Sequence, residues 1–406
     1  MAGTNRAVSI VLAAVLIDTI GFGIVLPVLP QLIVRLSHLP LAEATRIGGY
    51  MLMAFAAAQF FAGPVIGNLG DRYGRRPVIL ACMLAFGLDY ALMAFAPTLA
   101  WLFLGRVIAG VTGAVYGPAN AVLADVTPPE QRGARFGLMG AMFGLGFILG
   151  PALGGLLAGL DPRAPFLAAA VIALLNAVGI ALLLPETLAP ENRRPFEWRR
   201  ANALGAFAPL RQAGGAAPLI LTALVWQLAH MVYPSAWTFW AKIRFGWSEG
   251  QIGWSLAASG AVMIVTQALI TQRAIKLLGE ARAMLIGIAA GTLAFAAYAF
   301  IPGPGLVYAV ILLGFAQWFV FPSTNALLSR LVDARNQGAL QGGMASVGSV
   351  AAIAGPLMMS QALALGAERG FPGAAFALAA VLGVAALVIV ARFVLPRIAP
   401  AVAPTN

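Results

Sequence analysis

Three ionisable side chains lie inside long apolar runs of this 406-residue chain: Asp18, Asp89 and Arg106. On insertion scales, an Asp or Arg at the centre of a membrane helix costs about 2.5–3.5 kcal/mol, so such residues usually have a function. A carboxyl group that leaves water favours its neutral form, so Asp18 could bind a proton on one side of a membrane and release it on the other. We therefore predict that Asp18 carries a proton. The structural alternative is a carboxylate that caps a broken helix beside Gly21 and Gly23.

Asp89 and Arg106 are predicted to take part in the same chemistry. A buried arginine without a partner is costly, and these two residues are candidate partners for each other or for Asp18. If they exchange partners when a proton arrives, they form a switch that couples protonation to a change of shape. If they keep one partner, they form a fixed ion pair that holds the helices together.

Polar and aromatic side chains within the apolar runs indicate a cavity for a bulky, amphipathic solute. Such a cavity has a mainly apolar wall with a few hydrogen-bonding groups. His230 could also exchange protons near neutral pH, or it could be a hydrogen-bonded packing residue. The candidate lining residues are Gln59, Tyr116, Asn120, Gln227, His230, Tyr233, Trp237, Gln267, Gln317, Trp318 and Asn325.

The elements that position these residues must be membrane helices. The chain is 61% hydrophobic and 10% charged, with a mean hydropathy of +0.90, whereas soluble domains average about 45–50% apolar and about 25% charged residues. This composition excludes a soluble enzyme, a disulfide-stabilised secreted protein, a disordered chain and a nucleic-acid-binding domain. Long apolar runs without the short alternating segments of a β-barrel indicate helices. The predicted spans are residues 8–34, 47–69, 78–96, 98–123, 136–160, 165–184, 217–241, 250–275, 283–301, 305–328, 339–364 and 371–394.

The distribution of charge predicts the orientation of the spans. The net charge is +11, and most lysines and arginines fall on one side when spans and loops alternate. This bias predicts a multi-pass protein of the bacterial inner membrane with both termini in the cytoplasm. The first apolar stretch is too long for a cleaved signal peptide, so it is predicted to be the first span. The single cysteine, Cys82, excludes an internal disulfide.

The chain is predicted to consist of two similar six-helix bundles. The segments are an N-terminal bundle, a polar cytoplasmic linker and a C-terminal bundle, at residues 1–184, 185–216 and 217–406. Residues that match at an offset of 205 include Asn120 with Asn325 and Gly150–Pro151 with Gly355–Pro356. Duplicated six-span halves are typical of transporters, in which the substrate site lies near the middle of the membrane between the repeats.

Small residues in the fifth span predict close helix packing. Gly146, Gly150 and Gly154 recur every four residues and therefore share one helix face. Pro151 is expected to add a kink, and Gly355–Pro356 is expected to do the same in the eleventh span. We interpret this face as structural, with consequences for how the helices move.

Three motifs resemble those of the major facilitator superfamily. They are the loop Gly67–Arg76 after the second span, Leu104–Gly110 in the fourth span and Gly144–Gly155 in the fifth. Within this superfamily, the chain most resembles the twelve-span drug/proton antiporters of the tetracycline-exporter type. The residues that carry this second resemblance are Asp18 with Gly21–Gly23 and Pro27–Pro30, Gln59, Leu88–Tyr90 and Arg244–Trp247.

The resemblance implies an all-α membrane protein whose twelve transmembrane helices form two pseudo-symmetric bundles. It also implies that Asp71, Arg72 and Arg75 form a latch between the bundles on the cytoplasmic side; the alternative is ordinary positive-inside topology. Tetracycline exporters carry a functional histidine in helix 8 and an aspartate in helix 9, where this sequence has Met263 and Gly291. The predicted spans seven to twelve contain no Asp or Glu, so a proton-carrying carboxylate is expected in the first bundle.

We therefore predict a proton-coupled secondary transporter and not an enzyme. By this resemblance, it exports an amphipathic, tetracycline-like drug by alternating access, with the proton as coupling ion and no cofactor. The expected partners are the small-molecule substrate, protons and membrane lipids; we expect a monomer and no nucleic acid. Two alternatives stay open: a transporter of a lipid-like metabolite or sugar without drug/proton antiport, and a non-transporting receptor or assembly scaffold on the same fold.

Motifs for other chemistries do not fit this sequence. It contains no phosphate-binding loop and no cluster of metal ligands. Gly246–Gly250 matches the letters of a hydrolase nucleophile motif, but no strand is predicted before it.

Overall fold

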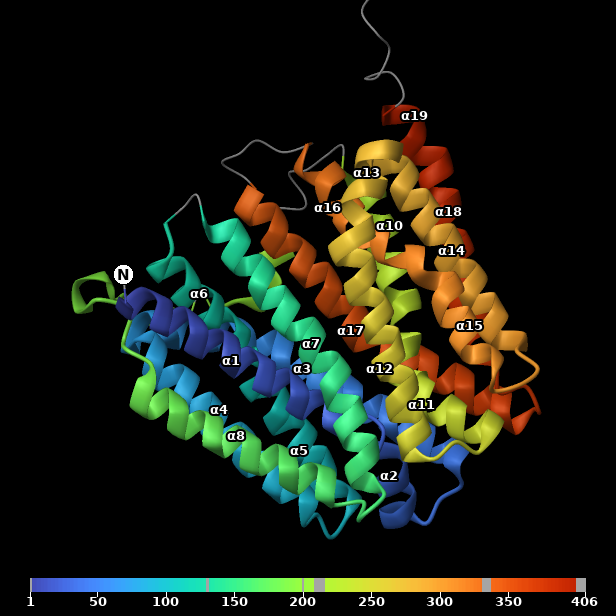
Figure 1. The fold of residues 1–406 in the computed structure, drawn as a ribbon, viewed down its shortest axis with the longest axis horizontal. Coiled ribbons are helices and arrows are strands. Elements are labelled where there is room, and N and C mark those ends of the chain that lie inside the picture. Colours follow the sequence, from blue (N-terminus) through green and yellow to red (C-terminus); the bar gives the residue numbers. More distant parts are fainter. Residues whose placement is uncertain (1, 129–130, 199–200, 208–215, 331–336, 399–406) are drawn as a thin grey trace, which may run out of the picture. The chain divides into compact units, whose positions relative to one another are not determined.

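The computed structural model describes residues 2–128, 131–198, 201–207, 216–330 and 337–398, which are mainly helical and contain no strand (Figure 1). The α-helices are α1 (Ala2–Val25), α2 (Leu29–Ser37), α3 (Leu41–Tyr73), α4 (Arg75–Ala94), α5 (Leu99–Thr112), α6 (Tyr116–Val126), α7 (Arg132–Ala158), α8 (Ala164–Leu183), α10 (Ala217–His230), α11 (Val232–Phe245), α12 (Glu249–Val265), α13 (Gln272–Leu278), α14 (Glu280–Phe300), α15 (Leu306–Leu313), α16 (Val320–Ser329), α17 (Gln337–Glu368), α18 (Ala374–Ile389) and α19 (Leu395–Ile398). The 3₁₀ segments are η1 (Gly113–Val115), η3 (Pro190–Asn192), η4 (Ala203–Phe207) and η6 (Gly314–Phe319), and the π-helical segments are η5 (Thr266–Thr271) and η8 (Val390–Val394).

Twelve helical segments within the described residues are long and apolar enough to cross a membrane. They are Arg6–Val25, Leu41–Tyr73, Arg75–Ala94, Leu99–Val126, Arg135–Ala158, Ala164–Leu183, Ala217–Phe245, Glu249–Leu278, Glu280–Phe300, Leu306–Ser329, Leu340–Glu368 and Ala374–Val394. Some of these segments join α-helices through a short 3₁₀ or π-helical turn, as α5, η1 and α6 do. The predicted all-α fold with twelve membrane helices is confirmed.

The first predicted span, residues 8–34, is wrong at its C-terminal end. Helix α1 ends at Val25, and Leu26–Val28 form a turn before α2 begins. Pro27 lacks a backbone N–H and cannot continue the helical hydrogen bonding. Pro30 lies in the first turn of α2, where a missing N–H costs nothing. The two prolines therefore divide the apolar run into a membrane helix and a short separate helix.

Acidic residues lie at three helix ends in the second half of the chain. Glu249 begins α12, Glu280 begins α14 and Glu368 ends α17, each a few residues beyond the predicted span. The prediction that spans seven to twelve contain no acidic residue is therefore wrong at these ends. The interior positions of these helices carry none in the described residues, and the two N-terminal glutamates face the positive end of their helix dipoles.

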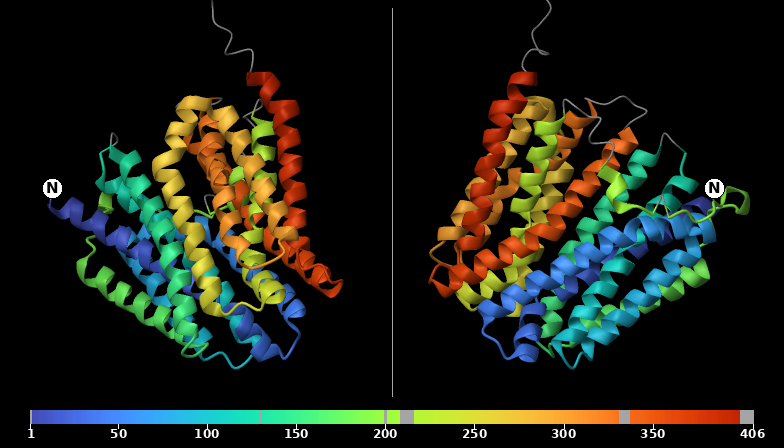
Figure 2. Two further views of the ribbon diagram at one scale, coloured as in Figure 1. Left: turned by 45° about the vertical axis from the view of Figure 1, so that its right-hand side comes forward. Right: turned by 180° about the vertical axis from the view of Figure 1, so that it is seen from behind.

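The chain forms two compact units, and α3 and α12 each contribute to both. Unit 1 consists of Met1–Pro40, Ala54–Ala203 and Trp247–Gly260, and unit 2 consists of Leu41–Met53, Leu204–Gly246 and Ala261–Asn406. In unit 1, α1 packs on α7 and α8, and α4 packs on α5 and α8 (Figures 1 and 2). In unit 2, α14 packs on α18 and η6, and α10 packs on α17 and α18.

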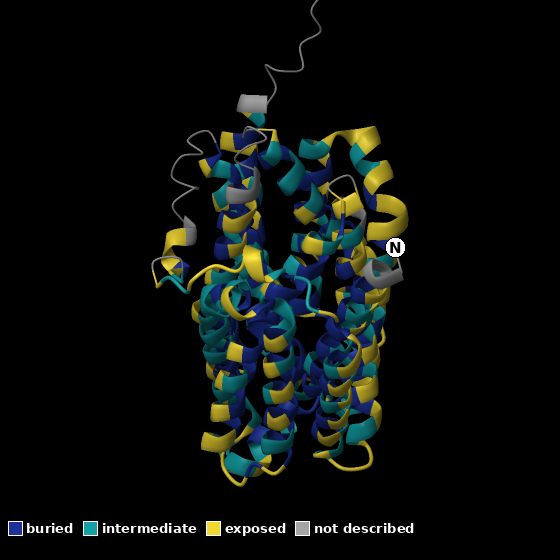
Figure 3. Ribbon diagram, turned by 90° about the vertical axis from the view of Figure 1, so that its left-hand side faces the viewer, coloured by how far each residue is buried: buried dark blue, intermediate teal, exposed yellow. Residues whose placement is uncertain are grey.

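The side chains of α8 illustrate how these helices divide between packed and outer faces. Leu175 and Leu182 are 64% and 74% exposed, whereas Ala173 and Ala177 are buried. Exposed and buried residues alternate along the helices in the same way in Figure 3. Small residues inside allow close helix contact, and large apolar residues outside suit a lipid environment.

Polar contacts join the beginning of α3 to the end of α17 in unit 2. Arg46 Nη2 lies 2.7 Å from Glu368 Oε1, and Arg46 Nε donates a hydrogen bond of 3.2 Å to Gln361 Oε1. Gly49 allows this approach, because a Cβ atom there would lie 3.0 Å from the Pro356 carbonyl oxygen. The ion pair is partly exposed, so the close backbone packing contributes more than the charges.

Candidate functional site

Asp18 lies in α1 and is 5% exposed. Its carboxyl group is a hydrogen-bond partner of the Tyr116 hydroxyl of α6, which also lies 2.9 Å from Thr19 Oγ1. The Asp18 oxygen Oδ1 has no hydrogen-bond partner among the described residues. A buried charge without full hydrogen bonding is costly, so this position suits a carboxyl group that changes its protonation state.

The helix around Asp18 is continuous. Helix α1 extends through Gly21 and Gly23 to Val25, so Asp18 does not cap a broken helix, and the structural alternative is wrong. The glycines serve packing instead. A Cβ atom at Gly21 would lie 3.0 Å from the Tyr90 hydroxyl, and one at Gly23 would lie 3.0 Å from the Gly150 Cα atom.

Asp89 of α4 and Arg106 of α5 are 2% and 3% exposed. They interact electrostatically, yet neither Asp89 carboxyl oxygen has a hydrogen-bond partner among the described residues. Arg106 Nη2 instead donates a hydrogen bond of 2.9 Å to Met93 Sδ. Arg106 Nε has no hydrogen-bond partner among the described residues. The two residues thus lie close in the core without forming the direct hydrogen-bonded ion pair of the fixed-pair hypothesis.

Tyr90 connects these two groups and was not among the predicted site residues. Its side chain is 1% exposed and interacts electrostatically with Asp18, Asp89, Arg106 and Tyr116. Its ring lies 4.5 Å from the ring of Phe86 in an edge-to-face arrangement. The available signal was its place directly after Asp89 in the Leu88–Tyr90 motif. Unit 1 therefore holds one buried polar cluster made of Asp18, Thr19, Asp89, Tyr90, Arg106 and Tyr116.

Unit 2 contains an aromatic cluster around His230. The His230 ring lies 4.5 Å from Trp226, 5.6 Å from Phe295 and 6.0 Å from Trp318. Gln317 interacts with His230 and also accepts a hydrogen bond of 3.2 Å from the Tyr233 hydroxyl. The predicted residues His230, Tyr233, Trp237, Gln317 and Trp318 are thus brought together, whereas Trp226 and Phe295 were missed because buried aromatics are usually ordinary core residues.

The other predicted lining residues lie apart from this cluster or in unit 1. Gln59 Nε2 donates a 3.0 Å hydrogen bond to the Gly113 carbonyl oxygen of η1. Asn120 is exposed on α6, and Gln267 is exposed on η5. The half-buried residues of this group are Gln227 on α10 and Asn325 on α16.

Gly291 marks a difference from the tetracycline-exporter pattern in packing as well as in sequence. A Cβ atom at Gly291 would lie 2.5 Å from the Trp226 ring and 3.1 Å from Gln317 Cβ. Trp226 therefore occupies the space that a side chain at position 291 would need. Met263 is half-buried on α12.

Charged side chains form a network around the Gly74 turn between α3 and α4 in unit 1. Arg75 Nη1 lies 2.5 Å from Asp71 Oδ1, and Arg75 Nε lies 3.4 Å from Asp125 Oδ2. Gly74 has a φ of 107°, a conformation that favours glycine. Arg72 is exposed, with its guanidinium 4.9 Å from the centre of the Tyr73 ring. The predicted latch residues Asp71 and Arg75 therefore contact each other within unit 1.

Glu186 anchors the start of α4 and was not predicted. Its carboxylate accepts hydrogen bonds from the Arg75 and Arg76 backbone N–H groups at 2.9 and 3.2 Å. These groups have no partner within their own helix, and a negative charge there also interacts favourably with the helix dipole.

Replacing Glu186 with Gln should therefore weaken this end of α4. Glutamine still has an oxygen that accepts hydrogen bonds, so the variant mainly loses the charge at the helix N-terminus, which is worth about 0.3–1 kcal/mol. We therefore expect the midpoint of thermal unfolding in detergent to fall by about one to two degrees. Glu191→Gln, at an exposed position of η3, is the matched control and should leave the midpoint unchanged. Equal midpoints for both variants would contradict the capping role.

The glycine face of α7 lies against α1. A Cβ atom at Gly146, Gly150 or Gly154 would lie 3.0, 2.7 or 2.2 Å from a carbonyl oxygen of α1. Gly355 of α17 has a similar contact in unit 2, where a Cβ atom would lie 2.3 Å from Met231 Cγ. Pro151 and Pro356 each lie inside their helix.

Comparisons with known proteins agree with this architecture. The model of the Major Facilitator Superfamily matches residues 11–356 and 219–406. The class C tetracycline resistance protein of Escherichia coli is 38% identical over 365 residues, which cover 90% of this chain and 91% of that protein. The class G tetracycline resistance protein of Vibrio anguillarum is 38% identical over 355 residues, which cover 86% of this chain and 88% of that protein.

Solved transporter structures share this fold. The human organic anion transporter MFSD10 (TETRAN) superposes with a TM-score of 0.72 at 25% identity, and the alignment covers 95% of this chain and 99% of the MFSD10 chain. The nucleoside transporter NupG has a TM-score of 0.75 at 15% identity, covering 95% and 98%, which supports the fold alone. The twelve membrane helices within the described residues and these relatives define a multi-pass membrane transporter. The chain belongs to the Major Facilitator Superfamily and is similar to its tetracycline resistance proteins.

Proposed function

We propose that this protein is a proton-coupled efflux transporter that exports an amphipathic, tetracycline-like drug. The observation that carries the proposal is Asp18, a buried carboxyl group in a membrane helix whose hydrogen-bond partner is a tyrosine hydroxyl. The similarity to tetracycline resistance proteins over most of the chain supports the class of substrate.

In the proposed mechanism, Asp18 holds the coupling proton. It binds the proton when it is accessible from outside and releases it towards the cytoplasm, while Tyr116 orients the carboxyl group. Asp89, Tyr90 and Arg106 lie close enough to respond electrostatically to this change of charge. The aromatic residues and amides of the predicted lining bind the drug during alternating access.

The proton gradient supplies enough energy for this exchange. Each positive charge that moves inward provides about 2.3 kcal/mol per 100 mV of membrane potential, and each pH unit adds about 1.4 kcal/mol. Because about 1.4 kcal/mol corresponds to a tenfold ratio of concentrations, one proton sustains more than a tenfold gradient of a neutral substrate.

The proposed location and organisation of the protein are those that the sequence predicts. The protein lies in the bacterial inner membrane as a monomer, with both termini in the cytoplasm and with bundles at residues 1–184 and 217–406. The network of Asp71, Arg72 and Arg75 serves as a cytoplasmic latch during the cycle. The proton is the only coupling species, and no cofactor takes part.

Proton release on substrate binding tests the proposed function. Tetracycline and a panel of amphipathic compounds are added one at a time to purified protein in weakly buffered detergent, and the pH is recorded. A substrate that competes with the proton should release it from the native protein and not from Asp18→Asn. No release from any compound in folded protein would contradict drug/proton exchange and favour the metabolite or sugar alternative.

A further inference from the structure

Unit 1 contains a continuous apolar region between Asp18 and the end of the unit where α4 begins. We define the apolar plug by the buried side chains Val11, Val15, Ile79, Met83, Val115 and Ile180. They come from α1, α4, η1 and α8 and line one pocket, and the two from α1, Val11 and Val15, precede Asp18 in that helix. Tyr116, the hydrogen-bond partner of Asp18, packs directly against this cluster.

The thickness of this region follows from the geometry of α1. The helix is buried at Ala7 and again at Val15, and eight residues of α-helix span about 12 Å. Apolar residues of α4 and α8 pack with this part of α1 in the same buried cluster. A proton that travelled from Asp18 along the inside of unit 1 would therefore cross about 12 Å of hydrocarbon-like packing.

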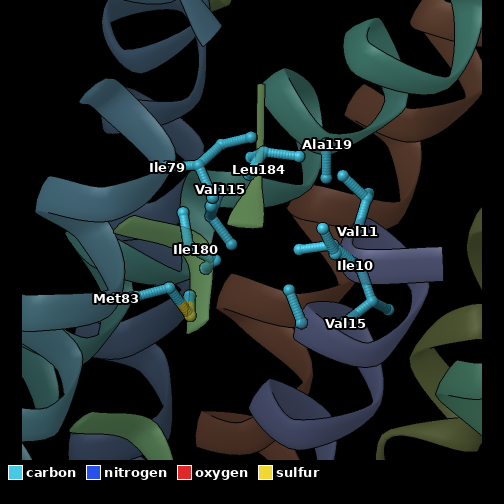
Figure 4. Close-up of a pocket in the computed structure, with 10 residues that line it drawn as sticks. Ile10, Val11, Val15, Ile79, Met83, Val115, Ala119, Ile180 and Leu184 are labelled. Carbon is cyan, nitrogen blue, oxygen red and sulfur yellow. The ribbon is translucent and has the colours of Figure 1, made fainter. Parts of the chain in front are cut away.

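A pocket lies within the plug and is lined by apolar side chains (Figure 4). Polar side chains nearby are already engaged: the Asn176 amide donates to the Ala14 carbonyl oxygen at 3.4 Å, and the Thr19 hydroxyl donates to the Val15 carbonyl oxygen at 2.8 Å. Water in a protein cavity needs two to four polar partners, and cavities lined by apolar groups stay dry. The pocket therefore offers protons no chain of water molecules.

We propose that the apolar plug is an insulating barrier that prevents protons from leaking between Asp18 and the end of unit 1 that carries the Gly74 turn. This inference rests on the proposed role of Asp18 in proton coupling. Because this internal route is closed, Asp18 can release its proton towards the cytoplasm only by a route that does not pass through the plug. Asp18 therefore releases its proton only during the transport cycle, and protons do not leak passively through unit 1.

A polar substitution within the plug tests the barrier. Ile180 is fully buried and lines the pocket, whereas Val178 on the same helix is 52% exposed on the outer face. The purified variants Ile180→Asn and Val178→Asn are reconstituted into liposomes with a trapped pH-sensitive dye. A potassium diffusion potential then drives protons inward without substrate. We expect passive proton flux at least tenfold above native for Ile180→Asn and native flux for Val178→Asn.

Further variants separate the barrier from simple packing and from the proposed function. Val11→Thr keeps the side-chain volume and serves as the second polar variant if Ile180→Asn does not fold; it should also leak. Ala14→Val, which fills the pocket, should not leak. Native flux in a folded polar variant would overturn the barrier. A leak that Asp18→Asn does not stop would support the barrier and contradict Asp18 as the proton carrier.

Discussion

Replacing Asp18 with Asn should abolish proton-driven export and leave the folded protein able to bind part of its substrate. Asparagine keeps the size of the side chain and its hydrogen bonding to Tyr116, but it cannot take up and release a proton near neutral pH. In membrane vesicles energised with a pH gradient, accumulation of the drug should fall to the level of vesicles without the gradient. Exchange of labelled for unlabelled drug without a gradient should persist.

The matched control for this variant is Asp161→Asn. Asp161 lies in the exposed loop before α8, where its carboxylate accepts a hydrogen bond of 2.7 Å from the Arg163 backbone N–H. The same change of charge there should leave active transport at the native rate. Full active transport by Asp18→Asn would rule out a coupling role for this carboxyl group. Loss of both active transport and exchange would place Asp18 in substrate binding instead.

The membrane helices could be predicted because the hydropathy of a segment depends only on its residue types and not on contacts with other segments. The predicted span 78–96 corresponds to α4 at Arg75–Ala94, and the predicted span 165–184 corresponds to α8 at Ala164–Leu183. The end of the first span was missed because its apolar residues continue past Pro27. Hydropathy measures only the cost of burial in lipid, whereas the proline changes the hydrogen bonding of the backbone.

The partners of the charged residues were not predictable from one sequence. The cost of burying charge singled out Asp18, Asp89 and Arg106, since that cost depends only on the residue and its apolar surroundings. That Asp18 meets Tyr116, nearly a hundred residues away, depends on how α1 and α6 pack. The same holds for the sulfur atom of Met93, which accepts a hydrogen bond from the Arg106 guanidinium.

The aromatic cluster of unit 2 could be predicted from the sequence only in part. The polar residues Gln317 and His230 stood out within apolar helices, but Trp226 did not, because a tryptophan in a membrane helix is ordinary by type. Its importance lies in the missing side chain of Gly291, which leaves room for the indole ring. This fit between Trp226 of α10 and Gly291 of α14 can be seen only in the folded structure.

Replacing Gly150 with Val should disrupt unit 1 and eliminate transport. A Cβ atom at this position would lie 2.7 Å from both the Gly23 Cα atom and the Ile20 carbonyl oxygen. Both contacts are with backbone atoms, so no rotation of a side chain can relieve them, and α7 must move away from α1. Overpacking of a well-packed core typically costs about 1–3 kcal/mol, and backbone contacts lie at the upper end of this range.

Gly140→Val is the matched control, because Gly140 lies on the same helix and a Cβ atom there would meet no neighbouring group of the described residues within 4 Å. Valine has the same effect on intrinsic helix propensity at either site, so any difference between the variants reports the contact with α1. We expect the Gly150 variant to lose folded yield in detergent and to unfold at a temperature several degrees below the native protein. The Gly140 variant should unfold and transport like the native protein. Since α1 also carries Asp18, native transport by Gly150→Val would mean that close packing of α7 on α1 is not needed to hold the proton site.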